Sequence, residues 1–360
     1  MSRPRVLFVS RERLRLPLDA TQRRKWDAVG VVLDHRVLAA AASGSPLRDG
    51  VVSLWPELPL LDGPLYYATL PGRVAAALRS LDPDAVFVQG VHEAAEVLTV
   101  RRALRSRARV ILDVQGDWRA VTRLYGSAAR RLLDPIGDAI GDRVVRRVDG
   151  IRTLSQFTSS LVRAAGGEPT AEFPPFVDTA VFLDPPVAPL PAEPTVLFVG
   201  VLERYKGFDT LARAWPHVDA RLHVVGRGTL EPLAQQLAAQ GARWTRSLDA
   251  EGVRAALDAS TLLCLPSRAE GLGRVVIEAM CRGRAVVGGR AGGIVDLVSE
   301  GVDGLLADPD DPEELAAAIE RALADADRLG AAARRAGERL AVTPERYAAN
   351  VLAVVRSTLA

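Results

Sequence analysis

The sequence predicts an α/β protein made of two Rossmann-like domains, each a parallel sheet covered by helices on both faces. The first observation is a short internal repeat, because residues 6–10 read VLFVS and residues 196–200 read VLFVG. The second is that each run opens a series in which short Val, Ile and Leu runs alternate with Ala-, Arg- and Leu-rich helical stretches. Near-continuous apolar strands separated by helices are typical of parallel sheets buried on both sides.

The later strands of each series are expected at the remaining short apolar runs. They lie at 85–88, 110–114 and 150–154 in the first half, and at 222–225, 262–265, 285–287 and 305–307 in the second. The Pro-rich segment Asp184–Pro194 between the two series is the natural linker. We therefore expect one domain at 1–185 and a second that begins at 186.

Ligands of doubly wound sheets bind beyond the carboxyl ends of the strands. Two such domains facing each other across a cleft would place the site between them. Most of the suggestive residues do follow predicted strand ends, namely Gln89, Gln115–Asp117, Gly200–Lys206, Gly226–Gly228 and Glu270.

The composition is that of a soluble globular protein, with 360 residues, 48% hydrophobic and 25% charged residues and a net charge of +2. Its two cysteines, Cys264 and Cys281, fall inside a predicted strand and helix and are typical of a reducing compartment. No run is apolar enough for a signal peptide or a membrane span. We expect a cytoplasmic protein with no nucleic-acid partner.

Several common sites are missing from the sequence. No G-x-G-x-x-G follows either first strand, so a nicotinamide cofactor is not expected, and there is no Walker-A loop. The four histidines are too widely spaced for a zinc site, and no metal is predicted.

Positive charge is concentrated in the first half. Residues 101–163 hold fourteen arginines and six acidic residues. This pattern is that of a solvated surface or of a surface that contacts anionic lipid or an anionic acceptor.

Residues 266–280 carry the most functional information. They follow the predicted strand 261–265, contain the turn Gly271-Leu272-Gly273 and end in a stretch with helical spacing. Such a turn lets a backbone approach a ligand and directs amide N–H groups at it. Glu270 and Glu278, on either side of the turn, can hold the hydroxyls of a nucleotide sugar. One loop glutamate and one solvated helical glutamate would give the same spacing.

Two basic residues follow the first strand of the second half. Arg204 and Lys206, after Gly200, can clamp a diphosphate, and Lys206 is one of only two lysines in the chain. Gly226-Arg-Gly228 and Gly292-Gly293 follow later strands and are further anion contacts or simply turns.

Polar residues also follow strands of the first half. Gln115 and Asp117, beside Trp118, are the kind of amide, carboxylate and aromatic groups that bind sugar hydroxyls and rings. His92 follows the Gln89-Gly90 strand end and is either structural or a substrate contact. Arg11, in the predicted loop 10–17, faces either an anionic donor or acceptor, or water.

Together these motifs resemble retaining glycosyltransferases of the GT-B fold, family 4. The matching segments are V-G-x-L-x-x-x-K-G at 199–207, V-V-G-x-G at 224–228, P-S-x-x-E-G-x-G-x4-E-A-M at 266–280, GGIVD at 292–296 and DGLL at 303–306. In the first half, LS at 154–155 and FPPFVDTAVF at 173–182 are similar to the approach to the interdomain crossover. The stretch 344–359 resembles the helix that crosses back onto the first domain.

The resemblance implies a role for each matching position. Glu278 would hold the donor ribose, Glu270 the transferred sugar, and Arg204 and Lys206 the departing diphosphate. Backbone at Gly200, Gly226 and 271–273 would lie against the UDP- or GDP-sugar. The implied domains are an acceptor-binding domain (1–185 with about 344–360) and a donor-binding domain (186–343). The implied acceptor is a hydroxyl of an envelope polysaccharide, a glycolipid or a small molecule.

Three positions depart from the family pattern. Val201 stands where many members have Arg, Gln115 where many have His near the donor sugar, and the loop 10–17 lacks the usual Gly-Gly. Two other functions remain open on the sequence. One is a nucleotide-sugar epimerase of the same fold, and the other is a non-catalytic sugar-binding relic.

Overall fold

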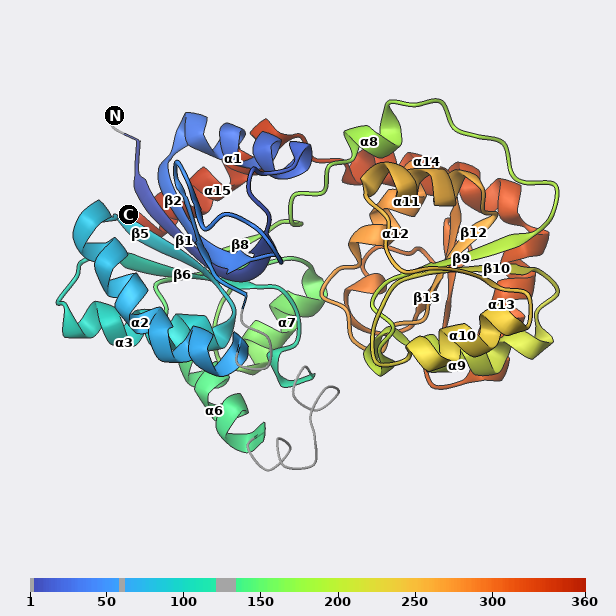
Figure 1. Cartoon of the computed structure of the whole chain (residues 1–360), viewed down its shortest axis with the longest axis horizontal. Coiled ribbons are helices and arrows are strands. Elements are labelled where there is room, and N and C mark those ends of the chain that lie inside the picture. Colours follow the sequence, from blue (N-terminus) through green and yellow to red (C-terminus); the bar gives the residue numbers. More distant parts are fainter. Residues whose placement is uncertain (1–2, 58–61, 121–133) are drawn as a thin grey trace. The chain divides into compact units, whose positions relative to one another are not determined.

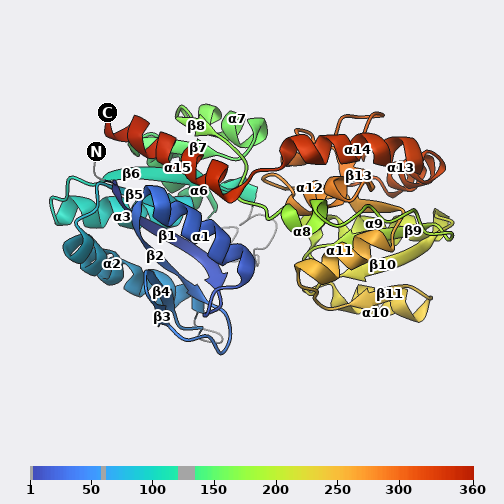
Figure 2. The same ribbon diagram turned by 90° about the horizontal axis from the view of Figure 1, so that it is seen from above.

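The computed structural model describes residues 3–57, 62–120 and 134–360. The chain divides into two compact units. Unit 1 comprises Met1–Phe176 and Thr343–Ala360, and unit 2 comprises Val177–Val342. Each is an α/β layered structure with one central sheet (Figures 1 and 2).

Unit 1 is built on an eight-stranded sheet in the order β3-β4-β2-β1-β5-β6-β7-β8, parallel except for the β3–β4 pair. The strands are β1 (Arg5–Leu14), β2 (Asp34–Ala41), β3 (Arg48–Asp49), β4 (Val52–Trp55), β5 (Ala85–Gln89), β6 (Arg109–Val114), β7 (Gly150–Thr153) and β8 (Ala171–Glu172). The described helices are α1 (Ala20–Val32), α2 (Asp62–Leu81), α3 (Val91–Ala103), α6 (Asp134–Val145), α7 (Gln156–Ala164) and α15 (Pro344–Leu359).

Helices cover both faces of this sheet. Helices α1 and α15 pack together on one face, and α2, α3 and α6 pack on the other (Figure 1). The central strands are apolar on both sides, with Val86, Val88 and Ile111 fully buried, as expected for a parallel sheet covered twice. The last helix therefore belongs to unit 1 although it is far from it in sequence.

Unit 2 has a six-stranded, all-parallel sheet in the order β11-β10-β9-β12-β13-β14. The strands are β9 (Thr195–Val199), β10 (Arg221–Val225), β11 (Arg243–Thr245), β12 (Leu262–Leu265), β13 (Ala285–Gly289) and β14 (Gly304–Ala307). The helices are α8 (Ala180–Leu183), α9 (Phe208–Ala214), α10 (Glu231–Ala239), α11 (Ala250–Asp258), α12 (Arg274–Cys281), α13 (Pro312–Ala324) and α14 (Ala326–Leu340). Short 3-10 turns lie at Arg204–Lys206, Trp215–His217 and Gly292–Ile294.

The sheet of unit 2 is also covered twice. Helices α9, α10 and α13 lie on one face, and α8, α11, α12 and α14 on the other (Figure 1). The two cysteines are free and buried, Cys264 in β12 and Cys281 at the end of α12. The prediction of two parallel α/β sheets is confirmed.

The structure differs from the predicted organisation most at the end of β1 and at the division between the units. Residues 10–14 are not loop, because β1 runs on to Leu14, which is 3% exposed and pairs with Ala41 of β2 after a register shift. The division between units falls at 176/177, not at 185/186.

Unit 2 holds the Pro-rich segment that the sequence marked as a linker. Arg282, 0% exposed, donates to the carbonyl oxygens of Phe182, Pro185 and Pro186. Arg284 donates to those of Ala188 and Pro189. These guanidinium groups replace the sheet or helix partners that a Pro-rich backbone lacks.

Candidate functional site

Lys206 and Glu270 form an ion pair at the carboxyl ends of the β9 and β12 strands. Lys206 Nζ contacts Glu270 Oε2, and the two side chains are only 16% and 17% exposed. They are 64 residues apart in sequence and are joined because β9 and β12 are neighbours in the sheet. The structure thus brings together two residues that the sequence selected separately.

Backbone contacts at glycines fix the loops around this pair. Gly207 has φ +68°, and a Cβ there would overlap the carbonyl oxygen of Pro266. On the other side, Gly293 N donates to Glu270 O at 2.8 Å, and a Cβ on Gly292 would overlap that same oxygen. Only glycine permits such approach, so the loops after β9, β12 and β13 form one backbone assembly.

The loop after β10 joins the same assembly. A Cβ on Gly226 would overlap the carbonyl oxygen of Gly200. Glu203 accepts hydrogen bonds from Thr229 N at 2.9 Å and from Thr229 Oγ1 at 2.6 Å. Gly200 and Gly226, both predicted donor contacts, therefore lie side by side.

Arg204 lies apart from the Lys206–Glu270 pair. Its side chain is 74% exposed, and its Nε is 3.8 Å from Asp209 Oδ2. The position leaves it available to an anion arriving from solvent, and its catalytic role stays a prediction.

Arg268 was not selected from the sequence, yet it ties the two central loops. It makes a two-pronged contact to Asp209, at 2.7 and 3.1 Å, and its Nε donates to Asp310 Oδ1 at 2.6 Å. Its backbone N also donates to Tyr205 O at 2.8 Å. Because Arg268 lies between Ser267 and Glu270, the sequence motif places it in the loop after β12. The spacing of residues in the sequence does not identify Asp209 and Asp310 as its partners.

Glu278 lies in α12, about one turn after that helix begins at Arg274. Burial raises the pKa of this half-buried carboxyl to about 7, and the charge of Arg274 opposes the shift. Among the described residues its carboxylate has no hydrogen-bond partner. A ligand with hydroxyl groups would supply the hydrogen-bond donors that this carboxylate lacks.

The predicted sugar contacts of unit 1 fall into two groups. Gln115 Nε2 donates to Asp113 Oδ2 at 2.6 Å. Asp117 Oδ1 accepts from the backbone N of Arg119 at 2.9 Å, which closes the turn after β6. Both residues are half-buried at the carboxyl end of β6.

Arg11 and His92 form the second group, and Tyr67 connects them. The Arg11 guanidinium lies 5.7 Å from the Tyr67 ring centroid, and the His92 ring meets the same ring edge-on at 6.4 Å. The Tyr67 hydroxyl donates to Glu93 Oε1 at 2.8 Å, and Glu93 is 5% exposed. Burial and the Glu93 charge raise the pKa of Tyr67 above its usual range.

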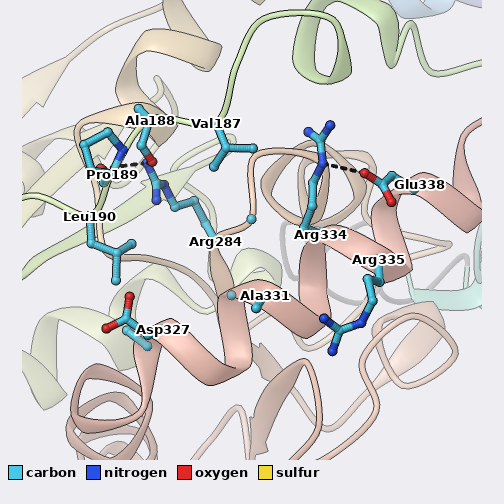
Figure 3. Close-up of a pocket in the computed structure, with 13 residues that line it drawn as sticks. Val187, Ala188, Pro189, Leu190, Arg284, Asp327, Ala331, Arg334, Arg335 and Glu338 are labelled. Carbon is cyan, nitrogen blue, oxygen red and sulfur yellow. Dashed lines mark hydrogen bonds and ion pairs between the residues drawn. The ribbon is translucent and has the colours of Figure 1, made fainter.

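A pocket of about 430 Å³ lies elsewhere in unit 2, between the Pro-rich segment and α14 (Figure 3). Its lining includes Val187, Leu190, Arg284 and Arg334. Arg284 precedes β13, so this pocket lies at the amino end of that strand, opposite the Lys206–Glu270 pair. The guanidinium groups of Arg284 and Arg334 already bond to backbone carbonyls, including those of Ala188 and Leu183. The pocket therefore does not coincide with the predicted donor loops.

Sequence comparison identifies the family. The family profile described as "Glycosyl transferases group 1" matches residues 193–325. A GDP-mannose-dependent alpha-(1-6)-phosphatidylinositol monomannoside mannosyltransferase of Mycobacterium tuberculosis (strain ATCC 25618 / H37Rv) is 30% identical over 307 residues, which cover 78% of this chain and 76% of that protein. The chain belongs to the glycosyltransferase group 1 family.

Other comparisons agree with this membership. The protein of the same name from Mycolicibacterium smegmatis is 30% identical over 60% of this chain and 64% of that protein. Among solved structures, this glycosyltransferase group 1 chain is similar to sucrose-phosphate synthase from Thermosynechococcus elongatus (TM-score 0.78, 20% identity, 98% of both chains). It is also similar to Anabaena HepE in complex with UDP-glucose (TM-score 0.71, 18% identity, 97% and 99% of the two chains). These likenesses establish the GT-B fold.

The described residues contain neither a candidate metal cluster nor a candidate membrane span. No three His, Cys, Asp or Glu residues gather there in a way that could hold a metal ion. None of the described helices is long and apolar enough to cross a membrane.

Proposed function

We propose that this glycosyltransferase group 1 member is a retaining, metal-independent enzyme that moves a sugar from a UDP- or GDP-sugar to a hydroxyl acceptor. The observation that carries the proposal is the Lys206–Glu270 pair beneath the glycine loops. A cation for a departing diphosphate and a carboxylate for sugar hydroxyls are held side by side before any substrate arrives.

The chemistry needs no carboxylate nucleophile in this proposal. The bond between the anomeric carbon and the diphosphate oxygen breaks, and a bond to the acceptor oxygen forms on the same face. The acceptor proton passes to the leaving phosphate. Lys206 and Arg204 stabilise the charge that develops on the diphosphate, as preorganised cations do at other leaving groups. Glu270 holds the transferred sugar, and Glu278 holds the ribose.

The donor backbone contacts are Gly200, Gly226, Gly271, Leu272 and Gly273. Gln115, Asp117, His92 and Arg11 serve as acceptor or sugar contacts in unit 1. The names of relatives support a nucleotide-sugar donor, since one is GDP-mannose-dependent and HepE was solved with UDP-glucose. The mannosyltransferase name, which contains phosphatidylinositol monomannoside, supports a glycolipid acceptor, and we propose an acceptor of envelope polysaccharide or glycolipid synthesis.

Calorimetry with UDP and GDP tests the donor half of this proposal. Binding of one of the two, lost in Glu278→Ala, is expected. If the wild type binds neither nucleotide, the donor assignment is wrong.

Turnover in excess EDTA tests metal independence. Product analysis separates sugar transfer from epimerisation, because only transfer consumes the acceptor.

We also place the enzyme in the cytoplasm, in peripheral contact with anionic membrane through the arginine-rich segment 101–163. Residues 121–133 of this segment lie outside the described residues. Sedimentation with anionic liposomes should show binding at low salt that is lost at high salt. Sedimentation that does not respond to salt would contradict an electrostatic contact.

A further inference from the structure

Three side chains of unit 1 form a hydrogen-bonded series that ends at Gln115. Arg152 Nη1 donates to Asp113 Oδ1 at 2.6 Å, and Gln115 Nε2 donates to Asp113 Oδ2 at 2.6 Å. Asp113 on β6 and Arg152 on β7 are register partners, which explains how residues 39 apart meet. The series runs from the sheet interior to the carboxyl end of β6.

Stability does not account for the buried pair in this series. Arg152 is 1% exposed and Asp113 is 6% exposed. The Arg152 guanidinium lies 4.4 Å from the Phe173 ring centroid, and its Nε and Nη2 have no hydrogen-bond partner among the described residues. Removing two charges from water at such a site costs about as much as, or more than, their attraction returns. A role in specifying a conformation is the better explanation.

The pair determines which way the Gln115 amide faces. A carboxylate held by a guanidinium only accepts hydrogen bonds, so Gln115 must present Nε2 to Asp113. Its carbonyl oxygen Oε1 is then directed away, and it has no partner among the described residues. Because Gln115 is half-buried at a strand end, this oxygen is a fixed hydrogen-bond acceptor at the place where ligands of such sheets bind.

We propose that Asp113 and Arg152 are positioning residues that hold the Gln115 amide with Oε1 turned toward the substrate, where it accepts a hydrogen bond from one hydroxyl of the transferred sugar. The inference rests on the proposed function, in which Gln115 is a sugar contact. A freely rotating amide would present a donor or an acceptor with similar ease. The locked amide instead requires a hydroxyl that donates.

Donor analogues test this polarity in the wild type. The probes are UDP-glucose or GDP-mannose, whichever is turned over, and its 3-, 4- and 6-deoxy and deoxyfluoro forms. At one position, both replacements should lower kcat/KM by a similar factor of roughly 10–100, because fluorine cannot donate a hydrogen bond. A deoxyfluoro analogue that stays active at the position where the deoxy analogue fails would overturn the proposal.

Asp113→Asn tests the lock itself. The carbonyl of the introduced side chain must face Arg152, so its NH₂ faces Gln115 and the Gln115 amide turns over, presenting its own NH₂ to substrate. We expect kcat/KM for the parent donor to fall at least about tenfold and the preference over the deoxy analogue to disappear. Nucleotide affinity by calorimetry should not change. Full preference retained in this variant would overturn the proposal.

Asp149→Asn is the matched control. Asp149 directly precedes β7 and pairs with Arg101 of α3 and Arg109 of β6, so it lies at the opposite, amino ends of the same two strands. Its variant should change thermal stability and leave the preference between analogues intact. Loss of the preference in this control would show that Asp113→Asn acts through the fold alone.

Gln115→Met keeps the inference testable if Asp113→Asn does not fold. It removes the amide with little change in volume, and it should abolish the preference between parent and deoxy donors. A wild type that binds and turns over no nucleotide sugar contradicts the proposed function. A wild type that transfers sugar, with a Gln115→Met variant that still discriminates, contradicts only the present inference.

Discussion

The two units begin with nearly the same strand but assemble their strand-end residues differently. In unit 2 the loops meet backbone to backbone, with Gly207 against Pro266 and Gly292 against Glu270. In unit 1 the predicted contact residues lie beside side-chain pairs, Asp113 of β6 with Arg152 of β7 and Tyr67 of α2 with Glu93 of α3. Close backbone contacts permit only glycine at the contact position, whereas a side-chain pair can be formed by several combinations of residues.

This difference bears on function. Glycine-dependent loops suit a ligand that is always the same, because the backbone presents the same N–H groups whatever side chains surround it. Side-chain pairs suit a surface that must change with the substrate. We infer that unit 2 carries the general part of the proposed reaction and that unit 1 carries its specificity.

The largest effect is expected from filling the backbone contact in unit 2. Gly207→Ala places a Cβ on the Pro266 carbonyl oxygen and forces alanine to φ +68°. It should destabilise unit 2 on the order of 4 kcal/mol, measured as a shift of its urea transition. Gly301→Ala is the control, since its φ is +73° and nothing lies within 4 Å; it should cost about 1–2 kcal/mol. Equal costs would show that the contact with Pro266 is unimportant.

Much of unit 2 could be predicted from the sequence because its loops depend on glycines at fixed positions. The glycines in the segments around Gly207 and Gly271–Gly273 set the conformation of these loops, so the sequence motif also predicts the shape of the loop. The strand predicted at 262–265 coincides with β12, and the one predicted at 222–225 agrees with β10 (Arg221–Val225) to within one residue, because a doubly covered strand is mostly apolar.

Unit 1 was less predictable. Strand β2 (Asp34–Ala41) and strand β4 (Val52–Trp55) contain polar residues and were not recognised. The partners Asp113 and Arg152, and the Tyr67–Glu93 contact, depend on strand order and register. Neither can be read from the spacing of one sequence, because the contacts join residues 39 and 26 apart.

The next effect concerns the Lys206–Glu270 pair. Lys206→Ala should lower kcat by roughly 10²–10³, because a preorganised charge is lost at the leaving group. Arg204→Ala is the comparison. Because that side chain is 74% exposed, solvent screens its charge, and we expect kcat to fall by less than about tenfold. Steady-state kinetics with saturating donor measures both. A larger loss for Arg204→Ala would exchange the two assignments.

Glu278 gives a smaller effect that depends on pH. Its folded-state pKa of about 7 lies above the ordinary carboxyl value of 4.5. The folded protein therefore keeps a proton that the unfolded chain releases, and stability is lost as the pH rises from about 4.5 to 7. Glu278→Gln should raise stability by up to about 3 kcal/mol at about pH 8 and change it little at about pH 4, as thermal unfolding would show.

Nucleotide binding should respond in the opposite direction. The carboxylate form accepts hydrogen bonds from ribose hydroxyls, so affinity for UDP or GDP should rise with pH up to about 7 and then level off. Glu278→Gln should bind weakly and without this pH dependence. A pH dependence that persists in the variant would assign the titration to another group.

The smallest effect tests the side-chain contacts of unit 1. Tyr67→Phe removes the hydroxyl that donates to the buried Glu93 carboxylate at 2.8 Å and should cost about 1.5–3 kcal/mol. Tyr66→Phe is the matched control, because its hydroxyl donates to a neutral carbonyl, Ser10 O, at 3.2 Å; about 1 kcal/mol is expected. Thermal unfolding measures both, and equal losses would show that the Glu93 charge does not strengthen its contact.

The same variant separates a scaffold role of Tyr67 from a binding role. Because the Tyr67 ring lies against Arg11 and His92, and the ring remains in Tyr67→Phe, KM for the acceptor should stay nearly unchanged. A large change in acceptor KM would mean that the hydroxyl itself meets substrate, and would move Tyr67 from the scaffold of unit 1 into its binding surface.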